Sequence, residues 1–203
     1  MGKGQIESLN GRKLHNLGFM GQGMTIAVLD AGFMNVDKIP AFKNLNIKGT
    51  RNFVAGYDND VYKEMDHGTK TLSTIAMNQP TVFVGTAPKA SFWLLRTEDY
   101  LTESSAEEDF WIAAVEFSDS VGVDVISSSL GYHGFDDKSM NYRYSDLNGK
   151  TAPISQAASR LTSKGIILVN SAGNDGMGTW KKINVPADAH DILTVGAVSL
   201  DKI

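Results

Sequence analysis

Thr25-Ile26-Ala27-Val28-Leu29 is a short apolar run that passes directly into Asp30, Ala31 and Gly32. A run of this length, rich in β-branched residues and without alternation, predicts a strand buried on both faces of a parallel sheet. Four more runs of the same kind follow it, at residues 91–95, 123–126, 166–169 and 192–195. Five such strands predict a layered α/β domain.

Two helices are predicted between these strands. Ser104 and Glu107 form the pattern of a capping box. Apolar residues then recur at helical spacing: Phe110, Ala114, Phe117 and Val121. A second helix begins near Pro153 and ends at Gly165, a C-terminal signal. Since crossovers between parallel strands are right-handed, helices should cover both faces of a mostly parallel sheet, in three layers.

Bulk composition excludes several classes of protein. The 203 residues are 42% hydrophobic, enough for one globular domain over residues 1–203. The net charge is -4 and the cations are scattered, so we expect no nucleic-acid partner. No run approaches the roughly 18 apolar residues that span a bilayer, so we expect no membrane partner. The absence of cysteine excludes disulfides and thiolate chemistry.

Three polar positions lie where strands end or a helix starts. Asp30 follows the first strand, so its carboxylate should emerge at the crevice edge of the sheet. His67 precedes residues with helical spacing, and the positive end of that helix disfavours the charged imidazole. Asn174 follows the strand at 166–169 and offers an amide donor to developing negative charge. Taken singly, each position also has an ordinary structural explanation, as a turn or a surface residue.

Read in order, these segments resemble the subtilisin-like serine proteases over nearly the whole chain. The matching segments are Ile26-Ala-Val-Leu-Asp-Ala-Gly32, Asp66-His-Gly-Thr69, Gly85-Thr-Ala-Pro-Lys-Ala90, Val125-Ile-Ser-Ser-Ser-Leu-Gly131, Ser171-Ala-Gly-Asn174 and Val185-Pro-Ala187 with Val195-Gly-Ala197. The resemblance implies a subtilisin-like domain and peptide-bond hydrolysis through an Asp-His-Ser triad.

The resemblance also implies roles for individual residues. Asp30 would orient the imidazole, and His67 would act as general base and then as general acid. Asn174 would donate to the oxyanion, beside Ala172 and Gly173. A polypeptide substrate would pair as an added strand against three residues of one edge: Ser129, Leu130 and Gly131. By the same analogy we expect the parent protein to be secreted or to lie in the cell envelope.

Three substitutions depart from the family pattern. Ala31 replaces the Ser or Thr usual after the aspartate, which removes a hydroxyl that would bond the carboxylate. We therefore expect weaker support for Asp30. Lys70 and Ser73 replace the His and Gly usual on the histidine helix. The ammonium of Lys70 should lower the pKa of His67 slightly.

The nucleophilic serine of the family lies in a Gly-Thr-Ser segment beyond the strand at 192–195, and nothing after Ser199 supplies it. We therefore expect the domain to lack its C-terminal part and to be inactive alone. An apolar face left bare should then be covered by self-association or local rearrangement. The alternative is a naturally truncated pseudoprotease that binds peptides without cleaving them.

Three further features leave alternatives open. Residues 132–150 are polar and aperiodic and predict a long surface loop, either a wall of the substrate site or an insertion without a role. Gly21-Gln22-Gly23 precedes the first strand, which argues against a nucleotide-binding loop. The oxygen-rich residues Asp58, Asn59, Asp60 and Asp66 would permit calcium, although their spacing favours a solvated loop, so we expect no cofactor.

Overall fold

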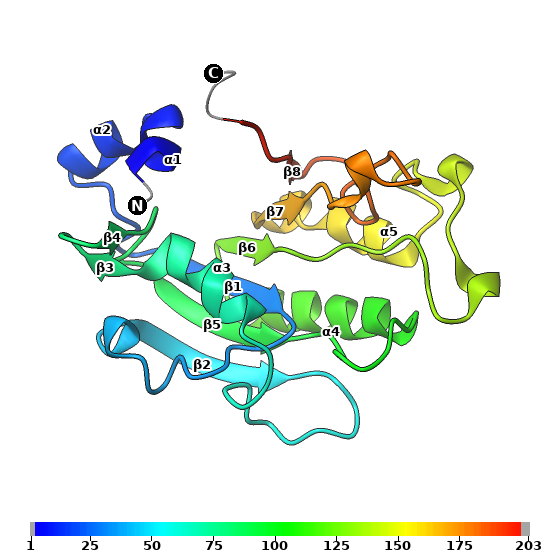
Figure 1. Cartoon of the computed structure of the whole chain (residues 1–203), viewed down its shortest axis with the longest axis horizontal. Helices are drawn as coiled ribbons and strands as arrows, with labels where there is room; N and C mark the ends of the chain where they lie inside the picture. The colour runs from blue at the N-terminus through cyan, green and yellow to red at the C-terminus, as the bar shows by residue number, and fades with distance from the viewer. Residues whose placement is uncertain (1–2, 200–203) are drawn as a thin grey trace.

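The fold is built on a parallel sheet of six strands, seen in the computed structural model, which describes residues 3–199 (Figure 1). Its order is β2-β5-β1-β6-β7-β8, and every neighbouring pair is parallel. The strands are β1 (Thr25–Asp30), β2 (Asn46–Asn52), β5 (Ser91–Arg96), β6 (Val125–Ser128), β7 (Ile167–Ser171) and β8 (Leu193–Val195). The five strands expected from apolar runs are confirmed, with ends shifted by at most two residues.

Helices cover both faces of this sheet, as predicted. They are α3 (His67–Ala76) on one face and α4 (Ala106–Ser120) and α5 (Pro153–Arg160) on the other (Figure 1). Side chains alternate along the central strand β1. Ala27 and Leu29 pack in the core cluster that contains α4 and α5, whereas Ile26 and Val28 pack in the cluster that contains α3. The unbroken apolar run is therefore explained by burial on two sides.

The helix ends follow the sequence signals. Ahead of α4, the Glu107 carboxylate accepts a hydrogen bond from the Ser104 N–H at 3.2 Å, one half of the predicted capping box. The Ser104 hydroxyl accepts from the Ala106 N–H, one position earlier than a full box requires. Helix α5 starts at Pro153, and a 3-10 turn, η4 (Thr162–Lys164), leads to Gly165 with φ of 82°.

Strand β2 is absent from the sequence-based prediction. Its sequence, Asn-Ile-Lys-Gly-Thr-Arg-Asn, is polar because the strand lies at the edge of the sheet and pairs only with β5. Gly49 lets the strand lie close to Trp93, since a Cβ there would be 2.4 Å from the indole ring. An edge strand with few buried side chains leaves no apolar run to recognise.

The remaining elements are short. They are α1 (Lys3–Ser8), α2 (Gly11–Asn16), the hairpin strands β3 (Asn78–Gln79) and β4 (Phe83–Val84), and the 3-10 turns η1 (Pro40–Phe42), η2 (Lys138–Met140), η3 (Tyr144–Asp146) and η5 (Asp175–Met177). The segment 132–150, predicted as a surface loop, begins differently. Tyr132 and Phe135 are buried in the core cluster of α4 and α5. Tyr132 and Phe135 therefore anchor the start of this segment to the core, whereas Tyr144 further along it is exposed.

Apolar side chains are exposed on β8, the second edge of the sheet, and on the residues beside it. Ile167, Leu193, Val195 and Val198 are all more than half exposed. Self-association through an apolar face stays a prediction. Within residues 3–199, no helix is both long and apolar enough to cross a membrane.

Candidate active site

Asp30 is the last residue of β1, and the alternation of the strand decides where its carboxylate points. Asp30 follows Ile26 and Val28 at intervals of two, so it lies on the face of the sheet that α3 covers. Its side chain is fully buried. A buried carboxylate needs donors around it, and the backbone after β1 and the side chains of α3 supply them.

His67 is the first residue of α3 and contacts Asp30 directly. Its Nδ1 lies 2.7 Å from Asp30 Oδ1, while half of the imidazole side chain remains exposed. With the carboxylate as acceptor, Nδ1 carries the proton, and Nε2 is left as the basic nitrogen. The Ala31 N–H donates to the same carboxylate oxygen at 2.8 Å. The two residues predicted to form the acid and the base are therefore brought together.

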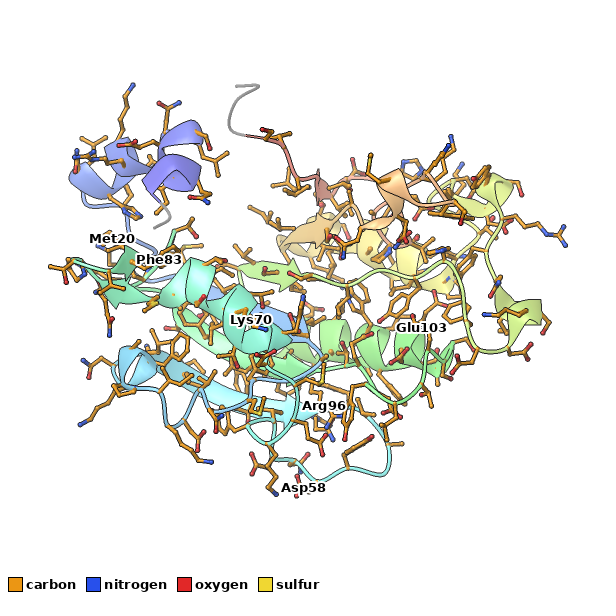
Figure 2. The ribbon with its side chains drawn as sticks, in the orientation of Figure 1. Met20, Asp58, Lys70, Phe83, Arg96 and Glu103 are labelled. Carbon is orange, nitrogen blue, oxygen red and sulfur yellow. The ribbon has the colours of Figure 1, made fainter. Side chains whose placement is uncertain are left out.

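The pKa of His67 is raised above its ordinary value, chiefly by the hydrogen bond to Asp30. Partial burial and the charge of Lys70 act in the opposite direction, and Asp66 adds to the increase. The lowering effect predicted for Lys70 is confirmed in direction, but the hydrogen bond to Asp30 outweighs it, so the pKa of His67 is raised and not lowered. Lys70, labelled on α3 in Figure 2, is held 2.8 Å from Asp66, which reduces its effect on the imidazole.

Gly68 allows α3 to approach the end of β1 closely. A Cβ at this position would lie 2.4 Å from the Gly32 carbonyl oxygen and 2.9 Å from the Asp30 Cβ. The backbone cannot move aside to relieve such a contact, whereas the end of a flexible side chain can. The Asp30–His67 distance therefore depends on the glycine that follows the histidine.

A cleft of about 700 Å³ opens beside His67. Its lining includes most of the residues predicted to bind substrate: Ser129, Leu130, Gly131, Gly173 and Asn174. Asn174 is exposed and immediately precedes η5. Ala172 is not part of the lining; its N–H donates to the Val195 carbonyl, and its own carbonyl accepts from the Asn184 N–H. The structure thus brings His67 and five of the predicted residues to one cleft, whereas Asp30, which contacts His67, and Ala172 are not on its lining.

An acidic wall of the same cleft was missed by sequence reasoning. Carboxylates from three segments line it: Glu98, Asp99, Glu103, Glu107 and Asp136 (Glu103 is labelled in Figure 2). Burial raises the pKa of Glu98 to about 8, and the Tyr132 hydroxyl donates to this carboxyl group. Burial likewise raises the pKa of Glu107 to about 7. The only sequence signal for this wall is the high density of Asp and Glu between residues 98 and 109. Part of that density, Glu107, is explained by helix capping.

The loop considered for calcium uses its carboxylates in ion pairs. Lys63 lies 2.7 Å from Asp58 and 3.4 Å from Asp60 (Asp58 is labelled in Figure 2), and Asp66 pairs with Lys70. Over the described range, 3–199, no group of three or more His, Cys, Asp or Glu is arranged to hold a metal ion. The geometry therefore gives these side chains lysine partners.

Comparison with known proteins gives consistent matches. The model of the subtilase family matches residues 21–202. Subtilisin E of Bacillus subtilis (strain 168) is 29% identical over 196 residues, which are 96% of this chain and 46% of that protein. Subtilisin Savinase of Lederbergia lenta is 30% identical over 90% of this chain and 58% of its own length. The chain thus spans about half the length of these relatives.

Two solved structures share the fold. MycP1 with its N-terminal propeptide removed has a TM-score of 0.69 at 22% identity, covering 97% of this chain and 63% of that one. The prenylagaramide maturation protease PagA has a TM-score of 0.66 at 20% identity, covering 93% and 58%. At this identity, the two structures support the architecture described above.

Proposed function

This chain belongs to the subtilase family, and we propose that it supplies the aspartate and the histidine of the catalytic triad, together with one wall of the substrate site, of a subtilisin-type serine endopeptidase. The observation that carries the proposal is the 2.7 Å contact between His67 Nδ1 and Asp30 Oδ1 at the edge of the 700 Å³ cleft. A buried carboxylate that holds a half-exposed imidazole is the arrangement that a general base requires.

The geometry suggests the following division of labour. His67 Nε2 takes the proton of the attacking serine hydroxyl, whose oxygen bonds to the substrate carbonyl carbon, and then gives it to the leaving amine. Asp30 keeps Nδ1 protonated and stabilises the imidazolium. The amide of Asn174 donates to the oxyanion, and the peptide lies along Ser129–Gly131. The serine itself would come from sequence beyond Ile203, because no serine of the chain follows Gly-Thr.

The whole protein would act on polypeptides, and by family analogy outside the cytoplasm. The 203-residue chain alone would bind peptides at most. A natural pseudoprotease is the competing function, in which the cleft binds peptides and no serine completes the triad.

A serine-directed fluorophosphonate distinguishes the two functions. We expect the protein encoded by the whole gene to be labelled on one serine C-terminal to Ile203 and to hydrolyse a peptide amide, because His67 deprotonates that serine. The same protein after heat denaturation is the control. A folded whole protein that binds peptides but neither reacts with the phosphonate nor hydrolyses the amide would establish the pseudoprotease.

Asn174→Leu should lower kcat of the whole protein about 100- to 1000-fold, the size of effect known for removal of the oxyanion asparagine of subtilisin itself. KM should change little, because the donor acts on charge that develops in the transition state. Steady-state kinetics on a peptide amide measure both constants. Asn16→Leu, an exposed asparagine outside the cleft lining, is the matched control. Equal kcat for Asn174→Leu and the unmodified protein would remove Asn174 from the mechanism.

A further inference from the structure

The Asp30 carboxylate is anchored at both of its oxygens. Oδ1 accepts from the His67 ring and from the Ala31 N–H. Oδ2 accepts from the Thr71 hydroxyl at 3.0 Å. Since Asp30 is fully buried, water does not solvate Oδ2, and a missing donor there would leave part of a negative charge uncompensated.

We propose that Thr71 is a positioning residue, whose hydroxyl holds Asp30 in the orientation that His67 requires and takes the place of the hydroxyl absent at Ala31. The catalytic part of this proposal rests on the proposed function. The effect of the Thr71 hydroxyl on the pKa of His67 does not depend on the proposed function.

The helix places Thr71 in register with the site. Thr71 follows His67 by four residues, so both side chains lie on the same face of α3. The Thr71 hydroxyl also lies 3.1 Å from the Gly68 carbonyl oxygen, a contact within the helix that favours one side-chain rotamer. The hydroxyl has one proton, and a carboxylate is a stronger acceptor than a carbonyl. The same rotamer therefore presents this proton to Asp30.

Anchoring at Oδ2 prevents rotation of the carboxylate. Turning the carboxylate plane would move Oδ1 away from His67 Nδ1 and would break the hydrogen bond that raises the pKa of the imidazole. The Ala31 N–H holds only Oδ1, so it does not resist this rotation as a second donor on Oδ2 does.

Thr71→Val keeps the shape of the side chain and removes the donor. The groups that act on His67 are then Asp30, Asp66 and Lys70. Without the hydroxyl the carboxylate can rotate and its hydrogen bond to His67 weakens, so the pKa of His67 should fall by about half a unit. In the whole protein kcat should fall about tenfold with KM nearly unchanged, since the less restrained carboxylate orients the base poorly.

The experiment titrates ¹³C-labelled histidine of the whole protein by NMR and measures the pH profile of peptide hydrolysis. Thr71→Ser should restore both the pKa of His67 and kcat. Thr74→Val is the matched control, because the Thr74 hydroxyl donates to the carbonyl of Thr71 in the same helix and not to Asp30.

The outcomes separate the two proposals. A folded Thr71→Val protein with unchanged pKa of His67 and unchanged kcat overturns the inference, as does a loss of thermal stability without a shift of that pKa. If the pKa shifts and serine restores it while even the unmodified protein hydrolyses nothing, the proposed function fails and the positioning role stands.

Discussion

His67→Ala is expected to lower kcat of the whole protein by about a millionfold, a magnitude known for the histidine of subtilisin itself. Among the described residues, His67 is the imidazole that contacts Asp30, and its half-exposed side chain lines the cleft. Without it, the attacking hydroxyl keeps its proton and the leaving amine receives none. Residual hydrolysis would come from the oxyanion donor and from substrate binding alone.

The measurement is hydrolysis of a peptide amide at high enzyme concentration, together with the rate of fluorophosphonate labelling. Both rates should collapse while peptide binding persists. His190→Ala, at an exposed histidine outside the cleft lining, is the matched control and should retain full activity. Hydrolysis by His67→Ala at the unmodified rate would show that another group is the base.

Asp30→Asn should lower kcat about 10⁴-fold, as in other enzymes with this triad. The asparagine amide fits the buried site, but its NH₂ group can donate toward the ring and stabilise the tautomer in which Nε2 carries the proton. Asp119→Asn, at an exposed carboxylate on α4, is the matched control. Activity within tenfold of the unmodified protein would contradict the assigned role.

Asp30→Asn should also change how the stability and the activity of the protein depend on pH. Asp30 raises the pKa of His67 above 6.5, so the contact stabilises the fold fully below that ordinary value. This contribution is lost as the pH rises through the raised pKa. In Asp30→Asn the pKa of His67 should fall, and the residual activity should persist to lower pH than that of the unmodified protein. Chemical denaturation at pH 5 and pH 9 measures the loss of stability, which should be larger at pH 5.

The sequence predicts the parts of the fold that depend on local patterns. Apolar runs identify β1, β5, β6 and β7, which carry buried side chains, and β8, whose apolar side chains are exposed at the edge of the sheet. The positions of Asp30 and His67 follow from the end of a strand and the start of a helix. The distance between the two side chains cannot be predicted in this way, because it depends on how closely Gly68 lets α3 approach β1.

What the sequence did not predict depends on contacts between distant segments. Ala31 suggested weaker support for Asp30, whereas the Thr71 hydroxyl reaches the carboxylate once α3 packs on the sheet. The acidic wall combines Glu98 and Glu103 with Asp136, which a long stretch of chain separates from them. Neither residue type nor spacing along the chain carries such information.

The strand order also sets the route by which the domain folds. Strand β1 lies between β5 and β6, with Thr25 paired to Ser91 and Ile26 paired to Val125. These pairings have high contact order, so large loops must close before the sheet gains any compensating burial, and folding should be slow. On the ribosome, β1 emerges first and waits unpaired for both neighbours. Asp30 therefore reaches its place late, because the strand that carries it is completed only by segments made after it.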